Sequence, residues 1–272
     1  MTFDLGSTLV VELLALGGIV GFLAGLLGVG GGAMLVPFMT LLLSFKGFPE
    51  PYVVKMAIAT SLATICFTSI SSVRAHHQRG AVRWRLVGLL APGIMLGALA
   101  GAQIAKRLPS NVLALLFSLF IGFSATRMLA AKKPKPTRQL PEGPTLFAAG
   151  GLIGMLSALV GAGGAFIAVP FMLACNLPMI NAVATSAALG FPIALAGTVG
   201  YIVAGWSLPD MPPGTLGFLY VPALLTLSTA SVVTAPLGAW AAHRINVQQL
   251  TRVFAGLLYT LAAYMFYKGL SL

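Results

Sequence analysis

The stretch "LLGVGGGAMLVPFM", Leu26 to Met39, places four glycines and a proline inside a run of apolar residues. Glycine leaves the backbone conformationally free, and proline lacks the N–H group that a helix interior needs. In lipid an unpaired peptide group has no water to bind. A broken backbone is therefore tolerated at membrane depth only where protein covers it or a wet cavity lies beside it. The stretch therefore predicts a break in a helix, at a place where protein or a wet cavity surrounds the backbone.

The composition around this stretch is that of a membrane protein. Of 272 residues, 58% are hydrophobic and 8% are charged, and the mean hydropathy is +0.97. Soluble domains carry about a quarter charged residues. Apolar stretches of about 20 residues, the length that spans a bilayer, recur along the whole chain. We therefore expect an all-α polytopic membrane protein.

The motif occurs twice. Residues 17–39 and 150–172 align without a gap at an offset of 133 and are identical at 12 of 23 positions. The Ala-Thr-Ser step at 59–61 recurs at 184–186, and Gly101 and Arg107 recur as Gly238 and Arg244 at an offset of 137. These matches indicate an internal duplication. The expected organisation is one integral membrane domain with a first repeat over 1–131, a cytoplasmic linker over 132–144 and a second repeat over 145–272.

Each repeat contains four hydrophobic blocks. They cover about 8–45, 52–73, 84–104 and 109–131 in the first repeat, and about 145–177, 179–204, 214–241 and 247–271 in the second. The opening block of each repeat is too long for one simple span. The glycine motif divides it into a longer arm and a short arm of about 12 residues, which is too short to cross the bilayer unaided.

The charges of the loops indicate the orientation of the repeats. The loop 74–85 and the linker are richest in Lys and Arg, so both are expected in the cytoplasm. The equivalent loop of the second repeat, 205–214, has no Lys or Arg and contains Asp210, so it is expected outside. Equivalent loops on opposite sides require an odd number of crossings per repeat. We predict two homologous inverted repeats with eight to ten transmembrane segments and glycine-broken short helices. A parallel repeat of eight plain spans is the alternative, and Lys106 and Arg107 fall on the unfavoured side of the inverted arrangement.

Glycine breaks at matching positions of inverted repeats are typical of secondary transporters, whose site lies between the repeats near the midplane. Exposed amide groups and a helix N-terminus together attract anions. We therefore expect the two glycine segments to meet and form an anion site from backbone groups. The hydroxyls near the start of each second block are expected to line the same cavity. The candidate substrate-binding residues are Gly28, Gly30, Gly31, Gly32, Thr60, Ser61, Gly161, Gly163, Gly164, Thr185 and Ser186.

The same residues also have structural interpretations. Glycines at four-residue spacing, such as 17, 21 and 25 or 93, 97 and 101, permit close packing of membrane helices. Threonine and serine hydroxyls often bond back to a helix carbonyl. Packing explains the contiguous glycines less well, because adjacent residues face different sides of a helix.

The acidic residues avoid the middle of the spans. Intramembrane carboxylates usually bind coupling cations or relay protons, so their absence favours an anion as the transported solute. His76 and His77 are the nearest candidates for proton coupling, although their basic loop is expected to be solvated. Lys55 and Arg127 lie near span ends, where long cationic side chains snorkel to water. The acids are Asp4, Glu12, Glu50, Glu142 and Asp210.

We expect no cofactor, no metal and no nucleic acid. Gly28-x-Gly30-x-x-Ala33 matches a dinucleotide fingerprint, but no strand precedes it, and the chain has no Gly-Lys-Ser/Thr motif for ATP. Cys66 and Cys175 form neither a disulfide framework nor a metal set. The net charge of +11 is explained by cytoplasmic basic loops. The expected partners are a small anionic substrate, membrane lipid and a possible second copy in a homodimer. An anion channel and a membrane-embedded enzyme are the alternatives, although nothing resembles a nucleophile–base pair.

The paired glycine and "VPFM" motifs resemble the TauE/SafE (sulfite exporter) family, also called the TSUP permeases. The "ATS" steps, "HHQRGAVRW" at 76–84 and "GALAGAQIAKRL" at 97–108 share this resemblance, which runs from about residue 10 to 270. It implies movement of small sulfur-containing anions, such as sulfite, sulfoacetate or aryl sulfonates, across the bacterial inner membrane, with export favoured. The N-terminal segment carries Asp4 and Glu12 instead of the basic region of a cleaved signal peptide. In the inverted arrangement, with the linker in the cytoplasm, both termini are expected in the periplasm.

Overall fold

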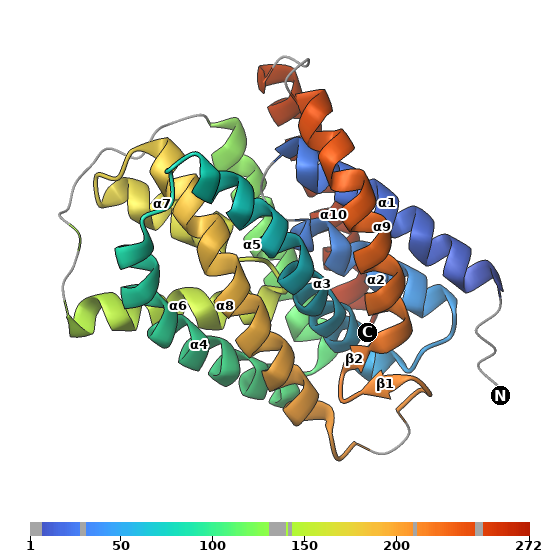
Figure 1. The fold of residues 1–272 in the computed structure, drawn as a ribbon. Coiled ribbons are helices and arrows are strands. Elements are labelled where there is room, and N and C mark those ends of the chain that lie inside the picture. The colour runs from blue at the N-terminus through green and yellow to red at the C-terminus, as the bar shows by residue number, and fades with distance from the viewer. Residues whose placement is uncertain (1–6, 28–30, 131–139, 141–142, 209–210, 243–246) are drawn as a thin grey trace.

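The computed structural model describes residues 7–27, 31–130, 140, 143–208, 211–242 and 247–272 (Figure 1). Within these ranges the chain forms helices and one two-stranded hairpin. The prediction of an all-α polytopic membrane protein is confirmed. The elements are α1 (Ser7–Leu27), α2 (Gly32–Phe45), α3 (Glu50–Gln78), α4 (Trp84–Arg107), α5 (Ser110–Leu129), α6 (Pro144–Val160), α7 (Ala165–Ala174), α8 (Met179–Gly205), β1 (Thr215–Leu216), β2 (Leu219–Tyr220), α9 (Val221–Ala242) and α10 (Val247–Ser271).

The opening block of each half is broken at its glycines, as predicted. The short arms α2 and α7 have 14 and 10 residues. In the second half, Gly161 ends α6 with φ +70° and Gly164 precedes α7 with φ +78°. Only glycine adopts this left-handed conformation at little cost, so these two residues allow the chain to leave one helix and enter the next.

Six helices among the described residues are long and apolar enough to cross a membrane: α3, α4, α5, α8 and large parts of α9 and α10. The other four, α1, α2, α6 and α7, are the arms of the two broken blocks. The expected range of eight to ten segments counted these arms as spans or parts of spans. Among the described residues, six uninterrupted helices are long and apolar enough for a span, and α1 contributes a shorter apolar segment, Thr8–Ala24.

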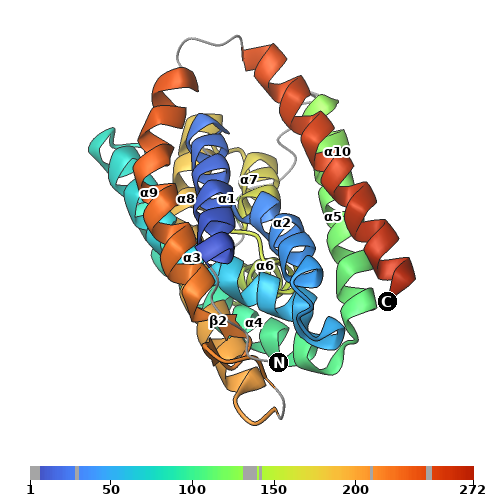
Figure 2. The same cartoon turned by 90° about the vertical axis from the view of Figure 1, so that its right-hand side faces the viewer.

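Each of the two halves, α1–α5 and α6–α10, packs its first helix against the other half, and we call these contacts the exchanged helix pairs. α1 packs against α9, and α6 packs against α4 (Figure 2). A side chain added at Gly17 of α1 would lie 2.9 Å from Leu227 Cα, and one added at Gly150 of α6 would lie 2.7 Å from the Leu90 carbonyl oxygen. At the offsets of 133 and 137, Gly17 is equivalent to Gly150 and Leu227 is equivalent to Leu90. The two contacts are therefore copies of each other, and glycine permits both.

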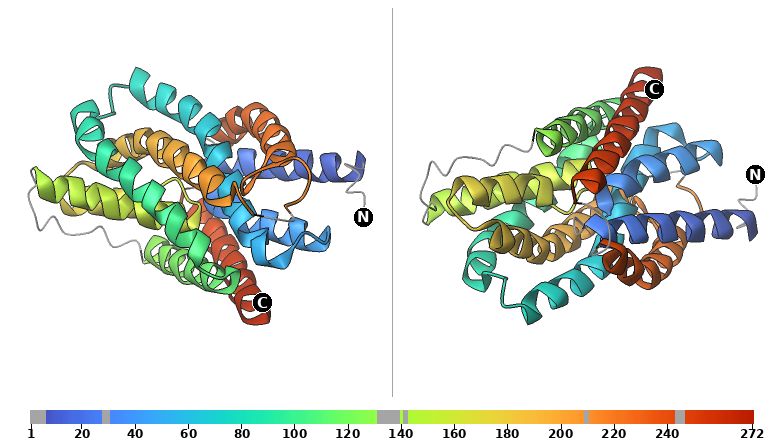
Figure 3. Two further views of the ribbon diagram at one scale, coloured as in Figure 1. Left: turned by 90° about the horizontal axis from the view of Figure 1, so that it is seen from below. Right: turned by 90° about the horizontal axis from the view of Figure 1, so that it is seen from above.

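The central pair, α3 and α8, runs antiparallel (Figure 1). Gly197 of α8 lies next to Leu62 of α3, and Gly190 lies next to Ser69. Residue numbers therefore increase along α3 in the direction in which they decrease along α8. The equivalent helices α5 and α10 pack together at one edge of the molecule (Figure 3). A two-fold axis along the helices would leave α3 parallel to α8. The axis that relates the halves therefore crosses the helices, which is the arrangement of an inverted repeat.

Two helix boundaries differ from the sequence prediction. α3 continues through the expected loop 74–85 as far as Gln78, because no residue before Gly80 (φ +64°) breaks a helix. α9 begins at Val221, although the predicted block began at 214, because Gly214 (φ +82°) and Gly217 (φ +57°) fold the preceding residues into the β1–β2 hairpin. Glycine at a positive φ thus sets the boundary in both cases, after α3 at Gly80 and before α9 at Gly214 and Gly217.

Candidate functional site

Ser61, on the central helix α3, joins the two glycine breaks. Its Oγ lies 3.2 Å from the Gly32 carbonyl oxygen and 3.1 Å from the Gly161 carbonyl oxygen, and the hydroxyl donates toward both. A Cβ added at Gly32 would lie 2.9 Å from that Gly161 oxygen. The start of α2 and the end of α6 therefore meet at the middle of the molecule, with a buried serine between them.

The first break presents the N-terminus of α2. The Gly31 carbonyl accepts hydrogen bonds from Met34 N at 3.1 Å and Leu35 N at 3.0 Å, which starts the helix. The first N–H groups of a helix have no partner within it, and they carry the positive end of the helix dipole. Gly28 and Gly30, which were also predicted to bind substrate, lie outside the described residues.

The second break is more tightly covered. Gly164 faces the side chain of Ile193, and a Cβ added there would also lie 3.3 Å from Ser157 Oγ. The Gly163 carbonyl oxygen lies 3.5 Å from the position of a Cβ on Gly190. Gly161, Gly163 and Gly164 therefore stand against α3, α6 and α8, and side chains of both halves surround them.

Thr60 and Thr185 hold loops at the two ends of the central helix pair. Thr60 Oγ1 accepts a hydrogen bond from Tyr220 N of β2 at 3.2 Å, and Thr185 Oγ1 accepts one from Arg83 N at 3.1 Å. Tyr220 and Arg83 are equivalent at the offset of 137. Each half thus supplies a threonine that fixes the loop preceding the third hydrophobic block of the other half, which forms α4 or α9. Neither threonine lines the pocket described below.

Ser186 is equivalent to Ser61 but has no comparable bonds. It is 1% exposed, and its Oγ has no hydrogen-bond partner. Ser157, beside Gly164, is also 1% exposed with an unpartnered Oγ. A buried hydroxyl without a partner is costly, and such groups often mark a place where water or a ligand binds.

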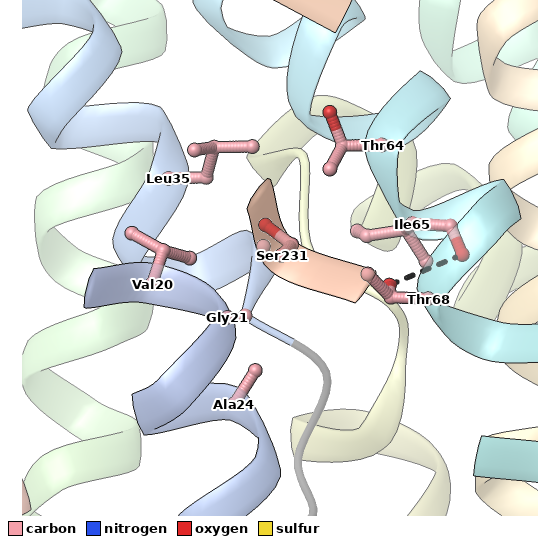
Figure 4. A pocket seen from close by; sticks show the side chains of 10 residues that line it. Val20, Gly21, Ala24, Leu35, Thr64, Ile65, Thr68 and Ser231 are labelled. Carbon is pink, nitrogen blue, oxygen red and sulfur yellow. Dashed lines mark hydrogen bonds between the residues drawn. The ribbon is translucent and has the colours of Figure 1, made fainter. Parts of the chain in front are cut away.

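A pocket opens beside the first break, between α1, α2, α3 and α9 (Figure 4). The space between its walls amounts to about 230 Å³ when the open solvent at its mouth is included, and in this conformation it admits about one water molecule. Three of its residues carry hydroxyls, namely Thr64, Thr68 and Ser231, and none of its residues is charged. It is lined by Val20, Gly21, Ala24, Gly31, Gly32, Leu35, Thr64, Ile65, Thr68 and Ser231.

The sequence analysis missed these three hydroxyl residues. A signal was present for two of them, because Thr60, Thr64 and Thr68 recur every four residues and so share one face of α3. Ser231 comes from α9 of the other half. Its Oγ donates to the Gly17 carbonyl at 2.9 Å across the exchanged helix pair. Only the tertiary structure brings it to the first break.

The described acids lie at helix ends, where they are paired. Glu12 forms an ion pair with Lys46 at 2.8 Å, and Glu50 forms one with Lys268 at 2.8 Å. No group of three His, Cys, Asp or Glu residues that could hold a metal ion occurs in the described part of the chain. The pocket walls therefore offer hydroxyl oxygens and main-chain groups as their polar partners.

Lys55 departs from the prediction that it snorkels to water. It is 7% exposed, and its Nζ donates to the Lys106 carbonyl oxygen at 3.2 Å. The ammonium also lies 5.7 Å from the centre of the Phe218 ring, at the tip of the hairpin. The hairpin covers this end of α3, which the sequence placed beside open solvent, and so the cation is held by a carbonyl and an aromatic face.

Two inverted halves, broken helices and a hydroxyl-lined pocket at their junction define a polytopic helical membrane protein with an internal pocket. Residues 13–265 match the family described as "Sulfite exporter TauE/SafE". The chain belongs to this family, and the resemblance found in the sequence is confirmed.

The relatives share nearly the full length of the chain. A "Probable membrane transporter protein" of Haemophilus influenzae is 37% identical over 262 residues, which cover 96% of this chain and 99% of the relative. A "Probable membrane transporter protein" of Methanocaldococcus jannaschii is 24% identical, with 93% of this chain and 94% of the relative covered. No solved structure matches the chain. The family and these relatives support membrane transport as the activity.

Proposed function

We propose that this protein is a secondary transporter that moves small sulfur-containing anions, such as sulfite, sulfoacetate or other organosulfonates, out of a bacterial cell across the inner membrane. The observation that carries this proposal is the meeting of the two glycine breaks beside a pocket without charged side chains. A helix N-terminus and hydroxyl groups are neutral donors that suit an anion. The family description supplies the sulfur chemistry.

The proposed site lies between the repeats, where Ser61 joins the two predicted glycine segments, and the other predicted hydroxyl residues, Thr60, Thr185 and Ser186, lie outside the lining of the pocket. Among the predicted glycines, Gly31 and Gly32 line the pocket directly. Ser61 fixes the position of Gly32 relative to Gly161. Because the site is at the junction of two inverted halves, a rocking motion of one half against the other would expose it to each side in turn.

The direct test is exchange of labelled sulfite by the purified protein in proteoliposomes, followed by competition with thiosulfate, sulfoacetate and sulfate. A carrier shows saturable flux that is accelerated by unlabelled anion on the opposite side. Flux that does not saturate and is not accelerated in this way would indicate the channel alternative. No protein-dependent flux of any sulfur anion would contradict the proposal.

The proposed topology places the 79–83 connection in the cytoplasm, and the hairpin and both termini in the periplasm. The antiparallel α3–α8 pair supports opposite sides for the first two, because these connections lie at opposite ends of it. Single cysteines at Arg79 and Ser207, both exposed, can be introduced after replacement of Cys66 and Cys175. An impermeant thiol reagent added to whole cells should label only Ser207→Cys. Labelling of both positions from the same side would contradict the topology.

A further inference from the structure

The pocket has a counterpart beside the second break, but the counterpart is filled. At the repeat offsets, Thr64, Thr68 and Ser231 are equivalent to Leu189, Ile193 and Ile94. All three aliphatic side chains are fully buried. Ile193 packs onto Gly164, and the backbone of Ile94 packs onto Gly154. Three hydroxyl residues on one side of the molecule thus correspond to three aliphatic residues on the other.

This difference changes what each break can bind. Both breaks offer the N-terminus of a short helix, α2 or α7. Among the described residues, the N-terminus of α2 has a pocket beside it with hydroxyl groups in its walls. Beside α7, the Ser157 hydroxyl is buried without a partner, but the side chain of Ile193 packs onto Gly164. Branched aliphatic side chains at the second break cannot donate a hydrogen bond, and they occupy the volume that a solute would need.

We propose that the anion binds at the first break only, in the pocket between α1, α2, α3 and α9, and that Thr64, Thr68 and Ser231 are its side-chain donors. The inference rests on the proposed function and adds the location and the residues that recognise the substrate. The ligand class is a small oxyanion with a sulfite or sulfonate head. The number of hydroxyls equals the number of oxygens on such a head.

The hydroxyls can exchange their present partners for the anion. Thr64 donates to the Thr60 carbonyl at 2.8 Å, Ser231 to the Gly17 carbonyl at 2.9 Å, and Thr68 to the Ile65 carbonyl at a long 3.4 Å. Rotation about one bond turns each hydroxyl hydrogen from the helix carbonyl toward the pocket. Hydrogen bonds to an anion are stronger than those to a neutral carbonyl, so a bound oxyanion favours the turned arrangement.

The pocket is small, as is expected of a carrier that has no solute bound. Because the space now admits about one water molecule, a sulfite ion enters only when the walls separate. Two walls come from α1 and α2, on either side of the first break, and a third comes from α9 of the other half. Movement of one half against the other therefore widens this pocket. Thr68, at its partly exposed edge, is the first hydroxyl that an incoming anion meets.

The test compares sulfite exchange by wild type and by variants in proteoliposomes, with thermal unfolding as the check on folding. Thr64→Val and Thr68→Val together remove two hydroxyls at nearly constant volume, and we expect the KM for sulfite to rise at least about tenfold. Thr68→Ser in place of Thr68→Val should restore part of the affinity. Ile193→Val, at the equivalent position of the second break, should leave KM within about twofold of wild type.

The outcomes separate this inference from the function it rests on. If wild type exchanges sulfite and the double valine variant does so with unchanged KM, the pocket is not the binding site, and the proposed transport stands. An effect of Ile193→Val as large as that of the double variant would also overturn the one-sided site. If folded wild type exchanges no sulfur anion, both proposals are wrong.

Discussion

The two glycine breaks are equivalent in the chain and different in their surroundings. At the first break, Ser61 bonds to both glycine segments and a hydroxyl-lined pocket lies beside α2. At the second, Ser186 has no partner, and Ile193 covers Gly164. The backbone scaffold of the duplication has been kept, whereas the side chains around it have diverged. Features that both halves share are therefore best explained by folding, and features found in one half only are the better candidates for function.

The largest expected effect concerns a shared feature, the exchanged helix pairs. Gly17→Leu and Gly150→Leu each place a bulky side chain where the partner helix backbone already lies within 3 Å of a Cβ. Since neither backbone can move without separating α1 from α9 or α4 from α6, each variant should lose more than about 3 kcal/mol of stability. Thermal unfolding in detergent measures this.

The control is Gly256→Leu, because a Cβ at Gly256 meets nothing within 4 Å and the position is exposed. It should unfold near the wild-type temperature. If the two halves are copies in their packing, Gly17→Leu and Gly150→Leu should have similar costs. A large cost at only one of them would break the structural equivalence of the halves.

The next comparison is between the paired serines. Ser61→Ala removes the donor that the Gly32 and Gly161 carbonyls share at the buried junction, and should cost about 1–3 kcal/mol. Ser186→Ala removes a buried hydroxyl that has no partner, so stability should be unchanged or slightly increased. Thermal unfolding of both variants, together with sulfite exchange, distinguishes folding from function.

A loss of transport in Ser186→Ala without a loss of stability would assign the unpartnered hydroxyl to the transport cycle. That result would contradict the one-sided binding site if the KM for sulfite rose, because Ser186 belongs to the second half. A change in maximal rate at constant KM would instead leave the site where we propose it.

The third comparison is within the second break. Gly164 has φ +78° and faces Ile193, whereas Gly163 has ordinary contacts at 3.6 Å and beyond. Gly164→Ala should therefore cost about 1–2 kcal/mol through backbone strain and crowding. Gly163→Ala should change stability by less than about 0.5 kcal/mol. Equal costs, measured by thermal unfolding, would show that the break is not held by the conformation of Gly164.

The helices, their glycine breaks and the inversion of the halves could be predicted from the sequence because the signals for them are local. Hydropathy located the helices, and adjacent glycines followed by Val-Pro located the breaks in both halves. Loop charge suggested inversion, and the antiparallel α3–α8 pair has that arrangement. Each of these inferences depends on residues close together in the chain or on a simple comparison of the repeats.

The four-residue spacing of Thr60, Thr64 and Thr68 was a local signal for part of the pocket lining, but the rest of the lining could not be predicted because it depends on contacts between residues far apart in the chain. Nothing local shows that α1 packs against α9, so Ser231 had no visible link to the first break. Lys55 had the sequence position of a snorkelling residue, but the hairpin covers it. Thr60 and Thr185 were found as a repeated pair, yet their bonds to Tyr220 N and Arg83 N place them at loops.

The last comparison concerns that pair of loop contacts. Thr60→Val leaves Tyr220 N, which is buried, without an acceptor, and should cost about 1–2 kcal/mol. Thr185→Val leaves the amide of Arg83, an exposed residue, where water can replace the hydroxyl, so the cost should stay below about 1 kcal/mol. Hydrogen exchange at the amides of residues 218–220 and 81–83 measures both, with each variant serving as the other's control.

This difference bears on how the two ends open. The same threonine–amide bond closes each end of the α3–α8 pair. The 79–83 end adds one hydrogen bond, from Asn181 Nδ2 to the Ala81 carbonyl at 2.8 Å, whereas the hairpin adds the large side chain of Phe218, which packs against Tyr52 and Tyr201 with ring centres 6.0 and 6.2 Å apart. In a carrier that exposes its site to each side in turn, the end with the smaller contact opens more readily. Hydrogen exchange should therefore be faster at 81–83 than at 218–220 in the wild-type protein. Faster exchange at the hairpin would reverse the order in which the two ends are expected to open.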